Sequence, residues 1–155
     1  MTDRETTRLI AWSSELRRIH ARLREAVALA RAAAAGADES SAAADLSLYC
    51  RGFCAALDEH HRGEDRALFP AIEAAHPELA GTLRKLTQDH SMIDFLITRL
   101  TQATRANATA YEIEGHLEGI AAIMESHFAY EERQLVAVLD SLALEADPRD
   151  VLGRL

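Results

Sequence analysis

The chain has 155 residues, 48% of them hydrophobic, and a formal net charge of −8. This length fits one domain with a sizeable core, so we expect a single domain over residues 1–155. The acidic balance argues against nucleic acid and anionic membranes as partners, because phosphate-rich surfaces are bound by clustered Lys and Arg. The chain has no apolar segment of the signal-peptide or membrane-spanning kind, so we expect a cytoplasmic protein.

The composition predicts an all-α fold, since strand signals are nearly absent, alanine is frequent and only three prolines occur. The first predicted helix covers about residues 3–35, and Thr2 and Glu5 have the spacing of a capping box at its start. The second covers about 43–75. Pro70 falls inside this range, which predicts a kink or a fresh helical turn there.

The third predicted helix covers about residues 78–106 and the fourth about 110–142. A second capping-box spacing, Thr109 to Glu112, precedes the fourth helix. The chain ends in a short C-terminal tail. Four long helices joined by short loops are most simply an antiparallel up-down-up-down four-helix bundle.

Polar residues interrupt the apolar face of each predicted helix near its middle. Two of the helices carry a His-x-x-x-Glu pair, whose side chains lie one above the other with Cβ atoms about 5–6 Å apart. The midpoints of antiparallel helices meet at one level, so the polar residues converge in the core, where they are costly unless they bind an ion. The candidate ligands are His20, His60, Glu64, His90, His127 and Glu131.

These candidate ligands offer nitrogen and oxygen atoms and no thiolate, a set that suits iron, manganese or zinc. Two glutamates among four helices can bridge two ions, which lie about 3.5–4 Å apart in two-metal sites. A His-rich helical site with few protein ligands per ion favours redox-active iron over zinc or manganese.

The pattern resembles the hemerythrin-like family of His/His/Glu cation-binding domains over nearly the whole chain. The residues that carry the resemblance are His20, His60-x-x-x-Glu64 followed by Leu68-Phe69-Pro70, His90, and His127-x-x-x-Glu131. The resemblance implies a non-haem centre of two iron ions (Fe2+/Fe3+), bridged by the two glutamates and an oxo or hydroxo group. It also implies that the centre binds or reacts with O2, peroxide or nitric oxide.

The sequence departs from the oxygen-carrying members of that family at two positions. They have a second histidine four residues after the one on the third helix, where this chain has Asp94, and here His61 follows His60. The second ion could thus be completed by His61, by Asp94, or left with an open position. Asp65 is expected at the surface or beside the ligands.

The lost histidine argues against reversible O2 carriage and favours reactive or sensing chemistry. Two alternatives stay open: an oxygen- or iron-sensing module, and a di-iron oxidase or oxygenase acting on a small organic substrate. Whether the protein turns over a substrate stays undecided from sequence. If it does, we expect a peroxide-decomposing or O2-activating oxidoreductase.

Overall fold

The computed structural model describes residues 10–36 and 42–155, and the capping box expected at Thr2 and Glu5 lies outside them. Within the described ranges every regular element is helical, which confirms the all-α prediction. None of these helices is long and apolar enough to cross a membrane. The elements are α2 (Trp12–Ala35), α3 (Ala42–Gly63), the π-helical turn η1 (Glu64–Leu68), α4 (Phe69–Ala75), the 3-10 turn η2 (Pro77–Leu79), α5 (Ala80–Arg105), α6 (Ala110–Leu139) and α7 (Pro148–Leu152).

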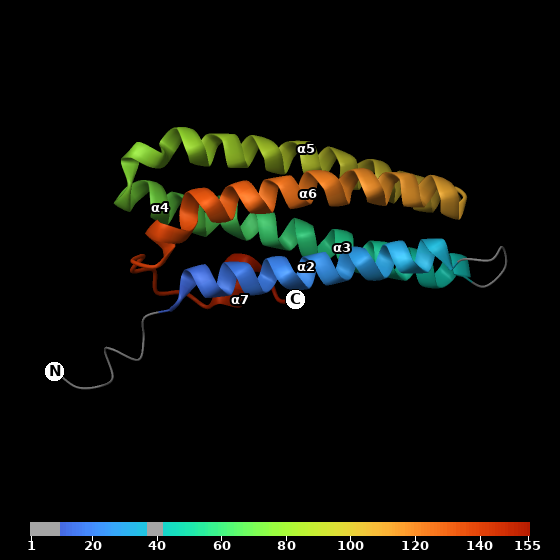
Figure 1. Ribbon diagram of the computed structural model, residues 1–155, viewed down its shortest axis with the longest axis horizontal. Helices are drawn as coiled ribbons and strands as arrows, with labels where there is room; N and C mark the ends of the chain where they lie inside the picture. The colour runs from blue at the N-terminus through green and yellow to red at the C-terminus, as the bar shows by residue number, and fades with distance from the viewer. Residues whose placement is uncertain (1–9, 37–41) are drawn as a thin grey trace.

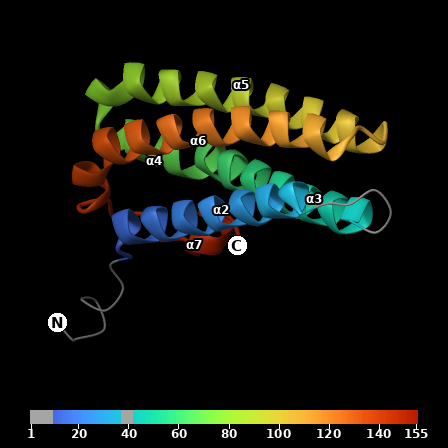
Figure 2. The same ribbon diagram turned by 45° about the vertical axis from the view of Figure 1, so that its right-hand side comes forward.

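Four long helices lie side by side along the long axis of the molecule (Figures 1 and 2). Helix α2 packs against α3 and α6, and α5 packs against α6 and α3. The colour sequence in Figure 1 runs in opposite directions along successive long helices. Each helix therefore turns one face toward a shared interior.

The interior is filled by apolar side chains that recur every three or four residues. In α2 the buried residues include Leu16, Ile19, Leu23 and Val27, which is the helical period. Burying a side chain of this size contributes about 1.5–3 kcal/mol. This apolar core runs through all four long helices and surrounds the polar residues described below.

The ends of α2 and α6 differ from the sequence-based boundaries. Helix α2 begins at Trp12, and Ala11 before it is not helical. Helix α6 begins with the expected capping box: the Glu112 N–H donates to Thr109 Oγ1, and the Thr109 N–H donates to Glu112 Oε2, both at 3.2 Å. It ends at Leu139 instead of residue 142, because the chain then turns and buries Leu142 in the core.

Pro70 is accommodated by a π-helical turn upstream of it. A proline inside a helix has no N–H to donate, and its ring collides with the carbonyl four residues earlier. Here the Phe69 N–H donates to the Glu64 carbonyl, five residues back, and Pro70 follows in the first turn of α4. The predicted fresh turn is therefore present. The wide turn η1 carries Glu64, and such turns recur at functional sites.

The C-terminal tail folds back onto the bundle instead of extending from it. Helix α7 packs against α2, α3 and η1 and lies beside α2 in Figures 1 and 2. Val151 and Leu152 are buried. The Trp12 indole N–H donates to the Leu144 carbonyl at 3.1 Å. Residues after α6 are thus part of the folded domain.

Candidate metal centre

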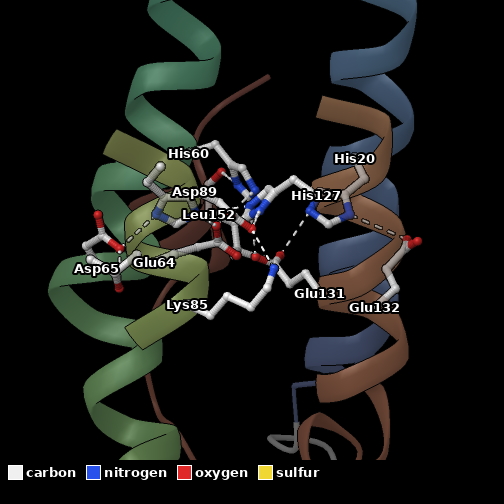
Figure 3. Close-up of polar contacts among 12 residues, drawn as sticks. His20, His60, Glu64, Asp65, Lys85, Asp89, His127, Glu131, Glu132 and Leu152 are labelled. Carbon is white, nitrogen blue, oxygen red and sulfur yellow. Dashed lines mark hydrogen bonds and ion pairs between the residues drawn. The ribbon is translucent and has the colours of Figure 1, made fainter. Parts of the chain in front are cut away.

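All six candidate ligands are buried and meet at one level of the core, where Figure 3 shows several of them converging from different helices. None is more than 5% exposed. His20 comes from α2, His60 from α3, Glu64 from η1 and His90 from α5, while α6 contributes His127 and Glu131. His61 joins them at 5% exposure.

These residues form two overlapping groups, in each of which one ligand atom per residue lies within 4.8 Å of the others. Glu64 belongs to both groups. Asp94 belongs to neither and is solvent-exposed, so the geometry brings in His61 and leaves Asp94 outside. The first group is His20, His60, Glu64 and Glu131, and the second group is His61, Glu64, His90 and His127.

Glu64 lies between a histidine of each group. Its Oε1 atom is 3.3 Å from His60 Nε2 and 3.3 Å from His90 Nε2. Its side chain is fully buried, and burial followed by the charge of Glu131 raises the pKa of Glu64 well above its usual range. In the metal-free protein this shift favours the neutral form of Glu64.

Glu131 also contacts a histidine of each group, one with each carboxylate oxygen. Its Oε1 atom is 3.1 Å from His20 Nε2, and its Oε2 atom is 3.5 Å from His127 Nε2. Burial, the largest single influence, raises the pKa of Glu131, but contacts with His20, Glu64 and His127 together outweigh burial and the net pKa is lowered. Burial lowers the pKa of His20, yet contacts with Glu131 and Glu132 outweigh burial and raise it above its usual value, which favours an ionic pair between His20 and Glu131.

His90 and His127 turn their Nε2 atoms toward each other at 3.1 Å. Each ring donates its outer N–H to a carboxylate: His90 Nδ1 to Asp65 at 2.8 Å and His127 Nδ1 to Asp89 at 3.2 Å. With Nδ1 protonated, two neutral rings would bring two Nε2 lone pairs face to face. A cation held by both rings would remove this repulsion, and carboxylates behind metal-bound histidines have the orienting role seen for Asp65 and Asp89.

His20 and His60 also have oriented rings, and the pKa values of His60 and His61 are lowered. The Nδ1–H of His60 donates to the Leu152 carbonyl at 2.8 Å, and His20 Nδ1 lies 3.4 Å from the Glu132 carboxylate. Burial, followed by the charge of nearby histidines, lowers the pKa of His60 to about 3 and that of His61 well below its usual value. Neutral imidazoles present the lone pair that a metal requires.

The inward-facing atoms of this cluster have no protein hydrogen-bond partner. They are Nε2 of His20, His60 and His61 and both carboxylate oxygens of Glu64 and Glu131. Each buried polar atom left unpaired costs about 1–3 kcal/mol, so several such atoms in one place are unfavourable without a ligand. A bound cation would give these atoms a partner, and nitrogen with carboxylate oxygen suits iron, manganese or zinc. The residues present therefore fit a metal centre.

Aromatic and aliphatic side chains close the cluster on most sides. Phe128 stacks on His20 with ring centroids 3.8 Å apart, and His90 lies between Phe69 at 5.5 Å and His61 at 3.9 Å. Such a wall limits solvent access and influences the properties of a bound ion. The buried apolar residues of the four long helices include Leu16, Leu23, Phe53, Leu57, Leu86, Ile93, Ile97 and Met124.

One pocket of about 190 Å³ opens beside the second group. His61 and His90 form its inner end, and Arg62 and Asp94 lie among its outer lining. Asp94 is thus placed to influence what approaches the site, although it does not belong to either ligand group. The pocket provides a short route from solvent for a small molecule or ion.

Sequence reasoning did not identify three of the groups that orient the histidines. Asp89 and Glu132 are chain neighbours of His90 and Glu131, and acids next to a ligand are a usable signal. The Leu152 acceptor is a backbone carbonyl, for which no side-chain signal exists. Asp65, expected at the surface or beside the ligands, is the hydrogen-bond partner of His90.

A comparison with protein families gives an independent assignment. The model described as Hemerythrin HHE cation binding domain matches residues 13–139. No curated protein and no solved structure gives a significant match. The match covers most of the chain and includes every residue of both ligand groups, so this protein belongs to the hemerythrin HHE cation-binding family.

Proposed function

We propose that this protein is a non-haem di-iron protein, built on an antiparallel four-helix bundle, that binds or reacts with O2, peroxide or nitric oxide. The observation that carries the proposal is the pair of buried ligand groups that share Glu64 and have unpaired inner atoms. The first group would hold one ion and the second group the other. When bound, a pair of iron ions bridged by an oxo or hydroxo group supplies reversible electron transfer and affinity for small diatomic ligands or peroxide.

The protein's own residues would set the conditions for that chemistry. Glu64 and Glu131 each face histidines of both groups, so each carboxylate could help to hold an ion in either group. His61 supplies a fifth histidine to the two groups, which compensates for the aspartate at position 94. Asp65 and Asp89 hold the rings of His90 and His127.

The pocket favours small ligands over an organic substrate. Sites for drug-sized molecules have volumes of about 300–1,000 Å³ and mostly apolar walls. This pocket has about 190 Å³ and is lined by charged residues that include Asp58, Arg62 and Asp94. A function as an oxidase or oxygenase of organic compounds is therefore less well supported than a reaction with O2, peroxide or nitric oxide. An iron-sensing role keeps support, because the unpaired buried atoms make the stability of the fold depend on metal.

The test is the metal content and absorption spectrum of protein purified from iron-supplied cells. We expect about two iron ions per chain, following from the two ligand groups, and oxo-bridge absorption bands that respond to reduction and to O2. Reversible changes would indicate ligand binding, and consumption of peroxide would indicate turnover. Zinc in place of iron, or no metal, would overturn the proposal. The cytoplasm remains the expected compartment from sequence alone.

A further inference from the structure

The C-terminal segment, residues 140–155, touches the candidate centre although it lies beyond the family match, which ends at residue 139. Its helix α7 packs against α3 and η1. The Leu152 carbonyl accepts the hydrogen bond from His60 Nδ1 at 2.8 Å, and both residues are buried. Figure 3 shows Leu152 beside His60. A ligand of the first group is therefore oriented by a backbone atom of the tail.

Two glycines allow this close approach. A Cβ at Gly63 would overlap the Val151 carbonyl oxygen, so no other residue fits there without moving the tail. Gly153 has a φ of 102°, a backbone conformation that residues with side chains rarely adopt, and it lies next to the backbone of His60. Glycine in a helix costs about 0.5–1 kcal/mol relative to alanine. The chain thus carries an unfavourable helix residue, Gly63, at the point where the tail approaches.

Further contacts attach the same segment to elements that carry ligands. Arg66 in η1 donates to the Asp150 carbonyl at 2.9 Å. At the other end, the Ser13 hydroxyl on α2 donates to the Asp140 carboxylate. The segment is therefore attached to the helix of His20 and to the turn of Glu64.

We propose that residues 140–155 act as a strap that positions His60, so that docking of the strap and binding of an ion in the first group are thermodynamically coupled. The inference rests on the proposed metal centre. With the strap docked, the Leu152 carbonyl keeps the proton of His60 on Nδ1, and the Nε2 lone pair faces Glu64 at 3.3 Å. Without the strap, either nitrogen can carry the proton and the ring loses its fixed orientation.

Coupling of this kind is reciprocal. If the docked strap raises the affinity for the ion by a given factor, the ion favours docking by the same factor. Loss of an acceptor behind a metal-bound histidine typically weakens metal binding by about 10–100-fold. The strap is therefore a positioning element, and its state reports whether the first group is occupied.

The first test compares two glycine substitutions on α3 in the full-length chain. Gly63→Ala places a methyl group against the strap, whereas Gly52→Ala meets nothing within 4 Å. Helix propensity alone favours both substitutions by about 0.5–1 kcal/mol, so a difference between them reports the strap. Anaerobic titration with Fe2+ measures how many ions bind and how tightly. We expect Gly63→Ala to weaken one of the two ions by about 10–100-fold and leave the other unchanged, and Gly52→Ala to match the wild type.

The second test uses the wild-type protein and does not depend on any variant folding. Trypsin cleavage after Arg149, which lies in α7, is followed by mass spectrometry with and without Fe2+. We expect iron to slow this cleavage by up to the factor by which the docked strap raises the affinity for the ion, which is about 10–100-fold. Cleavage after Arg105, at the end of α5 and outside the strap, serves as the control and should change little.

The outcomes separate the two proposals. If the wild type binds two ions but Gly63→Ala binds both as tightly as Gly52→Ala does, the strap does not position His60. An unchanged rate of cleavage at Arg149 on iron binding would likewise overturn the coupling. If the wild type binds no iron at all, the proposed metal centre itself fails.

Discussion

The two central glutamates should respond differently to the same substitution in the metal-free protein. Burial and the charge of Glu131 raise the pKa of Glu64 well above its usual range, which favours its neutral form. The pKa of Glu131 is lowered on balance, because contacts with His20, Glu64 and His127 together outweigh burial, so Glu131 is ionised. Glutamine closely resembles a protonated glutamate but lacks the charge of an ionised one. Glu64→Gln should therefore be tolerated and Glu131→Gln should not.

The magnitude follows from the contact between Glu131 Oε1 and His20 Nε2, which are 3.1 Å apart. Removing one charge of a buried ion pair costs about 3–5 kcal/mol, so we expect Glu131→Gln to lower the free energy of unfolding by about 3 kcal/mol. The raised pKa of Glu64 favours its neutral form, which glutamine resembles, and for Glu64→Gln we expect a loss below about 1 kcal/mol. Both variants should lose iron, because each removes a carboxylate that faces both groups.

Urea unfolding of chelator-treated protein at pH 7, followed by circular dichroism, measures these free energies. Glu125→Gln is the matched control: Glu125 lies on α6 like Glu131, but its side chain is 57% exposed and pairs with Arg24 at the surface. It should change neither stability nor iron content appreciably. Equal losses at Glu64 and Glu131, or a larger loss at Glu64, would refute the assigned charge states.

Three further outcomes are expected. His61→Ala should remove the ion of the second group, whereas Asp94→Ala should retain two ions by elemental analysis, since only His61 belongs to a ligand group; equal metal loss would contradict this assignment. Phe128→Ala should lower the free energy of unfolding by about 3–5 kcal/mol in chemical denaturation, because it leaves a cavity where a fully buried ring stacks on His20. A loss below about 1 kcal/mol would show that neighbouring side chains fill the cavity. The metal-free protein should lose stability as pH falls below 6.5, because burial lowers the pKa of His60 to about 3 and also lowers the pKa values of His61 and His127, so the unfolded chain binds more protons at these three residues. The raised pKa of Glu64 offsets part of this loss. Urea unfolding at several pH values measures the trend, and a flat profile would contradict it.

The amino-acid sequence by itself determined the helices and the layer of candidate ligands. Residues four apart share a helix face in any surroundings, so the pairs His60/Glu64 and His127/Glu131 were readable from local spacing. The capping box at Thr109 was readable for the same reason, because its two hydrogen bonds are local.

Only the tertiary structure decided which further groups complete the centre. His61 and Asp94 were equal candidates in sequence, and the choice depends on how α3 and α5 are rotated against each other in the packed bundle. The π-helical turn at Glu64 depends on where the chain absorbs Pro70. Asp65, Asp89 and the Leu152 carbonyl reach their histidines across helix interfaces or from the far end of the chain. Such contacts depend on packing between distant segments, which local periodicity does not encode.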